Sequence, residues 1–217
     1  MPSGRQTEGV ARCGGAVFTM RITSYFDYNC VFCYIGRYRL REAAKRTGAS
    51  IEWVAWSMPE GASPPPKPDD YREGVKRYVR AASEDLGLDI RLMRPVDTRD
   101  ALTGMYYARE EGVEEAYHQQ VFDARFLKGL DVSDRRVLTE CAEAAGLSGS
   151  RYLNTLDQEK YRALLEADFQ RAAGARIWTI PVYEADHRRL EVHHYDQLPT
   201  AGGLVDSLKL TGVKAED

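Results

Sequence analysis

The sequence lacks a long apolar run, and it lacks an excess of charge of either sign. No stretch reaches the roughly 18 consecutive apolar residues that predict a membrane span. The 33 acidic and 30 basic side chains nearly cancel and leave a formal net charge of −3, so the charge balance does not favour nucleic acid as a partner. No apolar block follows the basic residues Arg5 and Arg12, so no secretory signal is expected. We therefore expect a cytoplasmic protein that binds neither nucleic acid nor a membrane.

Cysteine is also scarce, with four in 217 residues: Cys13, Cys30, Cys33 and Cys141. A structural disulfide framework is not expected in a reducing compartment. A structural zinc site usually takes four ligands, commonly as two close pairs, and only Cys30 and Cys33 form such a pair. The pair therefore favours redox chemistry, with metal binding as the weaker alternative. We expect no metal and no bound cofactor, and we assign Cys141 to the core and Cys13 to an unstructured segment.

Residues 1–15 are rich in small and polar residues, and we expect them to be a disordered extension. The rest of the chain shows patterns typical of strands and of helices. Runs of β-branched and aromatic residues predict strands at 17–26, 51–58, 177–184 and 190–194. Helical propensity and one-sided apolar spacing predict helices at 38–45, 71–82, 98–111, 115–127, 134–145, 158–173 and 204–210. With Asn29 as N-cap and Gly48 as C-cap of the first helix, the cysteine pair lies between a strand and a first helical turn.

This order of elements predicts an α/β fold with a central mixed sheet flanked by helices. The four strands come from two separated parts of the chain, 16–58 and 176–217, and we assign these two parts to one domain. The helices of residues 59–175 then form an all-helical insertion in its middle. The chain is long enough, and at 43% hydrophobic residues apolar enough, to bury a core of this kind.

The chemistry is expected at the start of the first helix. A cysteine there meets unpaired backbone N–H groups and the positive end of the helix dipole, and both favour the thiolate, which is the reactive form. Cys30 lies nearer the helix start, so we assign it as the nucleophile. Cys33 lies one turn deeper and can attack a mixed disulfide and release the partner, as in thiol–disulfide exchange.

A proline late in the chain, in the segment IWTIPVYE, is out of place in a central strand. A cis peptide bond between Ile180 and Pro181 would expose the Ile180 backbone beside the cysteines. An extended substrate chain could then pair with that backbone. We assign substrate binding to Ile180 and Pro181, together with Val31 and Phe32 between the two cysteines.

The segment SYFDYNCVFCYIG, a helical insertion and the late IPVY together resemble the DsbA-like thioredoxin superfamily, and most closely its FrnE-type oxidoreductases. The resemblance covers roughly residues 18–210 and implies a thioredoxin fold with an inserted helical domain. It implies a protein-disulfide oxidoreductase in which Cys30 attacks and Cys33 resolves. Two departures stand out: Val31-Phe32 replaces the family's usual Pro-Trp, and Thr179-Ile180-Pro181 replaces Gly-Val-Pro.

Two alternative functions remain open at this stage. The chain also resembles the 2-hydroxychromene-2-carboxylate isomerases and kappa glutathione transferases, which act with glutathione and typically place Ser where this chain has Cys30. A binding protein that docks a partner on the helical block is the other alternative. For the oxidoreductase, the expected partner is a protein or small molecule that carries a thiol or disulfide, with glutathione as a possible co-substrate. The oligomeric state stays open, and a homodimer is one possibility.

Several further side chains receive structural assignments. We assign Asp27 to a turn or cap, with proton transfer to Cys33 as the alternative. All four histidines, His118, His187, His193 and His194, are expected on the surface. The three tryptophans, Trp53, Trp56 and Trp178, are expected in the core.

Overall fold

The computed structural model describes residues 20–58, 61–63 and 66–210. Its strands are β1 (Arg21–Phe26), β2 (Ser50–Ala55), β3 (Val182–Ala185) and β4 (Arg188–Glu191). Its helices are α1 (Val31–Thr47), α2 (Tyr71–Leu86), α3 (Arg99–Glu110), α4 (Glu114–Phe126), α5 (Arg135–Ala144), α6 (Gly149–Thr155), α7 (Glu159–Gly174), α8 (Ala201–Leu208) and a 3₁₀ helix, η1 (Tyr195–Gln197). The described part of the chain contains no helix both long and apolar enough to cross a membrane.

The four strands form one mixed sheet in the order β2-β1-β3-β4. β1 is parallel to β2 and antiparallel to β3, and β3 is antiparallel to β4. Tyr25 of β1 lies between Val54 of β2 and Val182 of β3 in the register. Five of the six residues of β1 are buried, as expected for a strand with a neighbour on each side and a helix on each face. The predicted mixed four-stranded sheet of a thioredoxin-like fold is confirmed.

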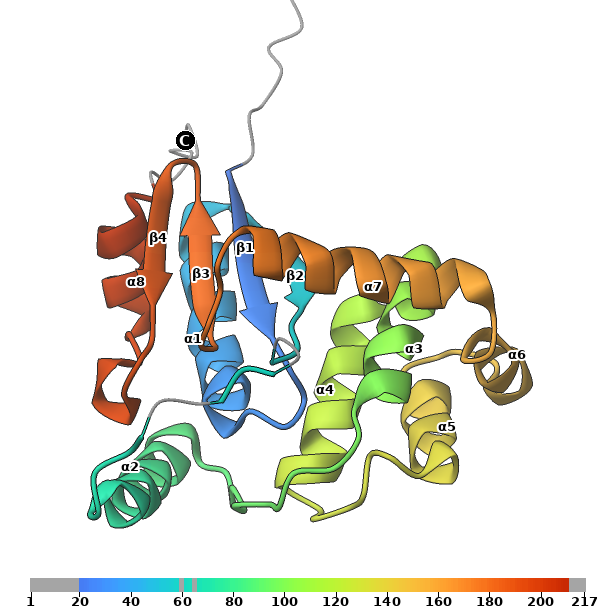
Figure 1. The fold of residues 1–217 in the computed structure, drawn as a ribbon, viewed down its shortest axis with the longest axis horizontal. Coiled ribbons are helices and arrows are strands. Elements are labelled where there is room, and N and C mark those ends of the chain that lie inside the picture. Colours follow the sequence, from blue (N-terminus) through green and yellow to red (C-terminus); the bar gives the residue numbers. More distant parts are fainter. Residues whose placement is uncertain (1–19, 59–60, 64–65, 211–217) are drawn as a thin grey trace, which may run out of the picture.

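Helices cover both faces of this sheet (Figure 1). α1 and α8 pack together on one face, and α7 crosses the other face, where it contacts β2. Under α7, Ala172 packs against Tyr25 and Val54. The larger core lies on the opposite face and continues into α3 and α4, with Phe26, Tyr34 and other fully buried side chains at its centre. Packing on both faces of the sheet therefore fixes the end of β1 and the start of α1.

The six helices between β2 and β3 do not pack as one group. α3, α4, α5 and α6 contact one another beside the sheet, whereas α2 lies apart from them and contacts η1 (Figure 1). α7 returns from this group to the sheet. The division into a sheet domain and one inserted helical domain stays a prediction.

Some element boundaries differ from the sequence-based expectation. α6 was not predicted, because its seven residues begin with Gly149 and are too few to show a helical period. β3 begins only at Val182, after Pro181 has removed a backbone donor from the predicted strand. β4 begins at Arg188, directly after a tight turn in which Asp186 has a φ of 54°. The predicted extension 1–15, with Cys13, lies outside the described residues, as does the start of the strand predicted at 17–26.

Candidate active site

The cysteine pair lies where β1 ends and α1 begins. Cys30, rather than the predicted Asn29, is the N-cap of α1: its backbone is extended, with φ −89° and ψ 106°, and its Sγ accepts a hydrogen bond from the backbone N–H of Cys33 over 3.2 Å. The Cys30 N–H in turn donates to the carbonyl oxygen of Asp27, 3.0 Å away. The structure therefore places the Cys30 sulfur at the N-terminal end of α1, with the backbone N–H of the first turn directed at it.

The two sulfurs differ in exposure. Cys30 is half-buried, whereas Cys33 is only 2% exposed, and both are free thiols. Burial raises the pKa of the Cys33 thiol well above its usual value, and its contact with the Cys30 sulfur raises that pKa further. A partner can therefore reach the Cys30 sulfur. The Cys33 sulfur is buried behind it, and its raised pKa favours the protonated thiol.

The predicted substrate-binding residues lie around Cys30, but not all in the same way. The Ile180–Pro181 peptide bond is cis, and the Cys30 thiol points at the carbonyl oxygen of Ile180, 3.8 Å from the sulfur. Phe32 is half-buried, with its ring 6.1 Å from that of Tyr78 on α2. Val31, in contrast, is the first residue of α1 and its side chain is buried. Among the four, only Ile180 lines the pocket described next.

A pocket of about 600 Å³ opens beside Cys30, between the sheet and the start of α3. Its apolar lining comes from distant parts of the chain: Trp56, Met58, Leu102, Phe169 and Ile180. Its polar lining includes Asp27, Asn29, Thr98 and Arg99. The pocket can therefore accept an apolar group next to the Cys30 sulfur.

Asp27 is buried directly before the cysteine pair. One carboxylate oxygen accepts a hydrogen bond from the Asn29 N–H at 2.6 Å, and the other accepts one from the Thr98 hydroxyl at 2.7 Å. The predicted turn role is therefore confirmed. Burial raises the pKa of this carboxyl, an effect that the two hydrogen bonds and the charge of Arg125 partly oppose. A buried carboxyl with a raised pKa next to a thiol is suited to accept a proton.

Sequence reasoning missed Arg125, whose side chain is fully buried behind the active-site turn. Its Nη2 donates to the Asn29 Oδ1 at 2.6 Å and to the Arg94 carbonyl at 2.7 Å. The Asn29 amide also exchanges two hydrogen bonds with the backbone of Val96, at 2.8 and 3.0 Å. This explains why Asn29 is not the helix cap: its side chain is already used to fasten the turn to the segment before α3.

His118 corrects the prediction of four surface histidines, because its ring is completely buried. Its Nδ1 lies 2.9 Å from the hydroxyl of Tyr28, and its ring packs edge-on against Phe26. Its Nε2 lies 3.6 Å from a carboxylate oxygen of Glu114, which is beyond hydrogen-bond distance. Burial lowers the pKa of His118, and Glu114 partly opposes that shift. α4 is buried on most of its sides, so its sequence shows no single apolar face that would have marked His118 as buried.

Trp178 corrects the prediction of three core tryptophans. Its side chain is 56% exposed, whereas Trp53 and Trp56 are buried as predicted. Its buried neighbour is Ile177, which packs under α7 and leaves the next residue facing solvent. Cys141 is buried, as predicted. Within the described ranges, no three His, Cys, Asp or Glu side chains lie close enough to hold a metal ion.

Residues 21–200 match the model of the family described as the DsbA-like thioredoxin domain. The chain belongs to the DsbA-like thioredoxin family. This membership agrees with the sheet order, with the cysteine pair at the start of α1 and with the proline before β3. Membership of this family supports a general oxidoreductase activity for this chain.

Individual proteins similar to this DsbA-like protein differ in what their names say. An uncharacterised protein, YwbO, from Bacillus subtilis is 30% identical over 163 residues, which are 71% of this chain and 78% of YwbO. A 2-hydroxychromene-2-carboxylate isomerase from Sphingobium xenophagum is 26% identical over 136 residues, 59% of this chain and 70% of the isomerase. The crystal structure of a probable DsbA oxidoreductase from Streptomyces coelicolor superimposes with a TM-score of 0.69 at 20% identity, covering 91% of this chain and 94% of that one.

Proposed function

We propose that this protein is a FrnE-type thiol–disulfide oxidoreductase that acts through Cys30 and Cys33. The observation that carries the proposal is the position of the Cys30 sulfur. It caps α1, lies next to the Ile180 carbonyl and borders an open pocket, while a second thiol is buried one turn behind it. The substrate class is a protein or small molecule that carries a disulfide or, in the reverse direction, a thiol pair. Glutathione is the proposed co-substrate that returns the pair to its starting state.

The first step joins Cys30 to the substrate. The Cys30 thiolate attacks one sulfur of a substrate disulfide, the substrate S–S bond breaks, and the leaving sulfur departs as a thiolate that takes a proton from water. The product is a mixed disulfide between Cys30 and the substrate. The Ile180 carbonyl oxygen lies 3.8 Å from the Cys30 sulfur, so the Ile180 backbone is next to this new bond and an extended substrate can pair with it.

The second step releases the substrate. Cys33 loses its proton and attacks the Cys30 sulfur, the Cys30–Cys33 disulfide forms, and the second substrate sulfur leaves as a thiolate. The substrate gains two electrons and the protein loses two. Because burial raises the pKa of Cys33, this step needs a base, and the buried Asp27 carboxylate is the proposed acceptor.

The test is the reduction potential of the pair, measured by equilibrating the protein in glutathione buffers and counting thiols. A value near about −270 mV would indicate a reductant and one near about −120 mV a strong oxidant. A Cys33→Ser variant should accumulate the mixed disulfide, a Cys30→Ser variant should form none, and Cys141→Ser, which alters a buried thiol away from the site, should behave as wild type. The proposal fails if no reversible disulfide forms at any glutathione ratio.

A second function, a glutathione-dependent isomerase, is favoured by one observation: the pocket beside Cys30 has an apolar lining and a volume that suits a small aromatic molecule. The two functions separate at residue 30. An isomerase that needs only a hydrogen-bonding side chain at this position should keep its turnover as Cys30→Ser, whereas the oxidoreductase should lose all exchange activity.

A further inference from the structure

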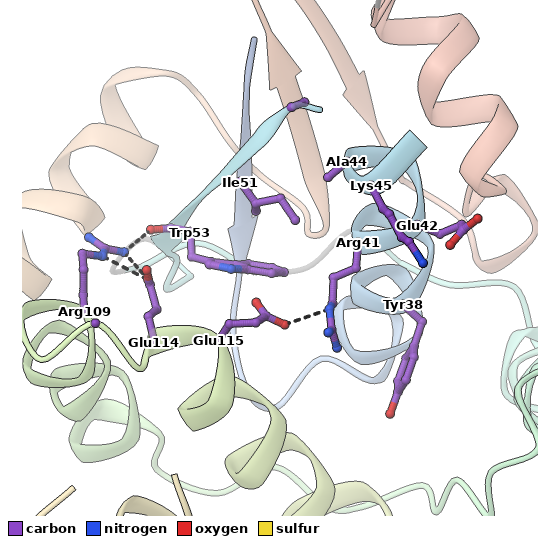
Figure 2. Close-up of a pocket in the computed structure, with 12 residues that line it drawn as sticks. Tyr38, Arg41, Glu42, Ala44, Lys45, Ile51, Trp53, Arg109, Glu114 and Glu115 are labelled. Atoms are coloured by element: carbon purple, nitrogen blue, oxygen red, sulfur yellow. Dashed lines mark hydrogen bonds and ion pairs between the residues drawn. The ribbon is translucent and has the colours of Figure 1, made fainter. Parts of the chain in front are cut away.

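Within the described chain, few buried polar atoms lack a hydrogen-bond partner. Around the pocket at the edge of β2, for example, Glu115 pairs with both Arg37 and Arg41, and Figure 2 shows the second of these pairs. The Tyr183 hydroxyl is different, because it is buried and makes no hydrogen bond with any residue that the structure describes. An unpaired buried hydroxyl costs free energy, so its retention calls for a physical reason.

The Tyr183 hydroxyl lies against helix α1, one turn after Cys33. Tyr183 is the second residue of β3, pairs with Ser24 of β1 in the register, and belongs to the core on the α1 side of the sheet. A Cβ at Gly36 would overlap the hydroxyl oxygen, so the absence of a side chain there lets the hydroxyl approach the helix. Cys33 and Gly36 are three residues apart, and residues at that spacing share one face of a helix. The hydroxyl is therefore a neighbour of the Cys33 side chain.

This hydroxyl stays protonated. Burial raises the pKa of Tyr183 well above its usual value, and the neighbouring sulfurs of Cys33 and Cys30 raise it further. The other titratable neighbours are Arg39 on α1 and Tyr78 on α2, and Arg39 donates a hydrogen bond to the Tyr78 hydroxyl at 2.8 Å. While Cys33 is a thiol, which is a weak acceptor, the Tyr183 donor has no good partner. A thiolate at Cys33 would be a strong acceptor next to it.

We propose that the Tyr183 hydroxyl donates a hydrogen bond to the Cys33 thiolate that forms in the second step of exchange. The proposal rests on the thiol–disulfide function proposed above. Cys33 passes its proton to Asp27, and its sulfur then attacks the Cys30 sulfur. The substrate sulfur leaves with the electron pair of the broken S–S bond, and Tyr183 keeps its proton throughout. The hydrogen bond raises the fraction of thiolate more than it lowers the nucleophilicity of the sulfur, so the step is faster near pH 7.

The test follows the two steps separately in a full-length Cys13→Ser, Cys141→Ser protein, which keeps only the active-site thiols. The probe is dithiobis-nitrobenzoate, an aromatic disulfide that releases one coloured thiol as Cys30 attacks and a second as Cys33 resolves. Tyr183→Phe should slow the second release by about three- to tenfold near pH 7 and the first release by less. The difference should vanish at high pH, where Cys33 is a thiolate with or without the hydroxyl.

Stability separates this role from a merely structural one. Tyr183→Phe should raise the Tm, because no polar group is left unpaired, even as it slows the second release. Gly36→Ala should lower the Tm and slow the same release, because the added Cβ displaces the hydroxyl. Tyr152→Phe is the matched control: it removes a buried hydroxyl that is hydrogen-bonded to Tyr117, away from the cysteines, and it should leave both rates unchanged.

The proposal is overturned if Tyr183→Phe releases the second thiol at the parent rate at every pH, or if Tyr152→Phe slows that release equally. A parent protein that releases only one thiol would contradict the exchange function itself, which is a different result from a slower second release in Tyr183→Phe alone. Should Gly36→Ala fail to fold, Tyr183→Phe decides alone, since phenylalanine fills the same space without the hydroxyl.

Discussion

The hydroxyl of Thr98 donates a hydrogen bond to the buried carboxylate of Asp27 over 2.7 Å. This contact joins the turn before Cys30 to the N-terminal end of α3, which is far away in the sequence. It also means that the carboxylate is oriented and yet kept out of water, so that burial raises its pKa. The same side chain thus shapes the turn and is available as a proton acceptor.

The first prediction concerns this carboxylate. Asp27→Asn keeps the size of the side chain but removes the base, so release of substrate from the mixed disulfide by Cys33 should slow by about tenfold or more near pH 7. The attack of Cys30 should change less. Stopped-flow measurement of the two phases separates them. Asp97→Asn, at a carboxyl that lines the same pocket, is the control, and an equal effect of both variants would contradict the role of Asp27.

The second prediction concerns Arg125, whose positive charge lowers the pKa of Asp27 and so opposes the effect of burial. Arg125→Met should therefore raise that pKa further and move the pH dependence of the Cys33 step to higher pH. Arg125→Lys, which keeps the charge, should restore most of the profile. Arg80→Met, at an exposed position of α2, should leave it unchanged. An unshifted profile in Arg125→Met would mean that Arg125 only holds Asn29 in place.

The third prediction concerns stability and pH at His118. Because burial lowers its pKa, the unfolded chain takes up a proton near pH 6.5 that the folded protein does not bind. The free energy of unfolding should therefore fall as the pH drops below about 6.5. Urea denaturation of His118→Phe should show a weaker fall. At pH 7 this variant should be less stable by about 1–3 kcal/mol, because the Tyr28 hydroxyl loses its partner.

The control for His118 is His187, whose side chain is 94% exposed in the turn before β4. His187→Gln should keep the wild-type dependence of stability on pH. If it flattened the curve as much as His118→Phe does, the buried histidine would not be the group responsible.

The fourth prediction uses Gly36 and Tyr183, which meet behind the cysteine pair. The Tyr183 hydroxyl is buried without a hydrogen-bond partner among the described residues, and a Cβ at position 36 would overlap it. Tyr183→Phe should stabilise the protein by about 1 kcal/mol, since no polar group is then left unpaired. Gly36→Ala should destabilise it by about 1–3 kcal/mol.

A double-mutant cycle checks this contact by thermal or urea unfolding. Gly36→Ala should cost less in the Tyr183→Phe background than in the wild type, because the overlapping atom is gone. Gly174→Ala, in a helix position with open space around it, should cause no loss of stability. Additive effects of the two substitutions would contradict the predicted overlap.

The parts of the site that could be predicted from the sequence are those with local signals. Cys30 and Cys33 follow a strand and open a helix within a few residues, and Pro181 interrupts a strand-like run. The contacts of Arg125 and His118 carry no such signal, because their partners Asn29 and Tyr28 lie 96 and 90 residues away in the chain. Only the packing of α4 against the active-site turn brings them together.

The helices and strands also divide into those with a local sequence signal, which were predicted, and those decided by contacts distant in the chain, which were not. Most of the longer helices were predicted to within about four residues at each end, but α1, the longest, was predicted only over 38–45 although it spans Val31–Thr47. Trp178 was misplaced because its residue type favours burial, whereas in the structure Ile177 takes the buried position after the turn at 175–176 and Trp178 is left exposed. Asn29 was assigned as a cap because its residue type suits one, and only the tertiary contact with Val96 shows that its amide is used elsewhere.

The capping role of Cys30 has a consequence for how this scaffold can change its chemistry over evolution. Whatever occupies position 30 must accept a hydrogen bond from the N–H of residue 33, or helix α1 loses its first turn's support. Serine meets that demand as well as cysteine does. A Cys30→Ser exchange should therefore keep helix α1 intact while it removes the proposed thiol–disulfide exchange. The fold can therefore keep its active-site helix whether or not position 30 carries a sulfur.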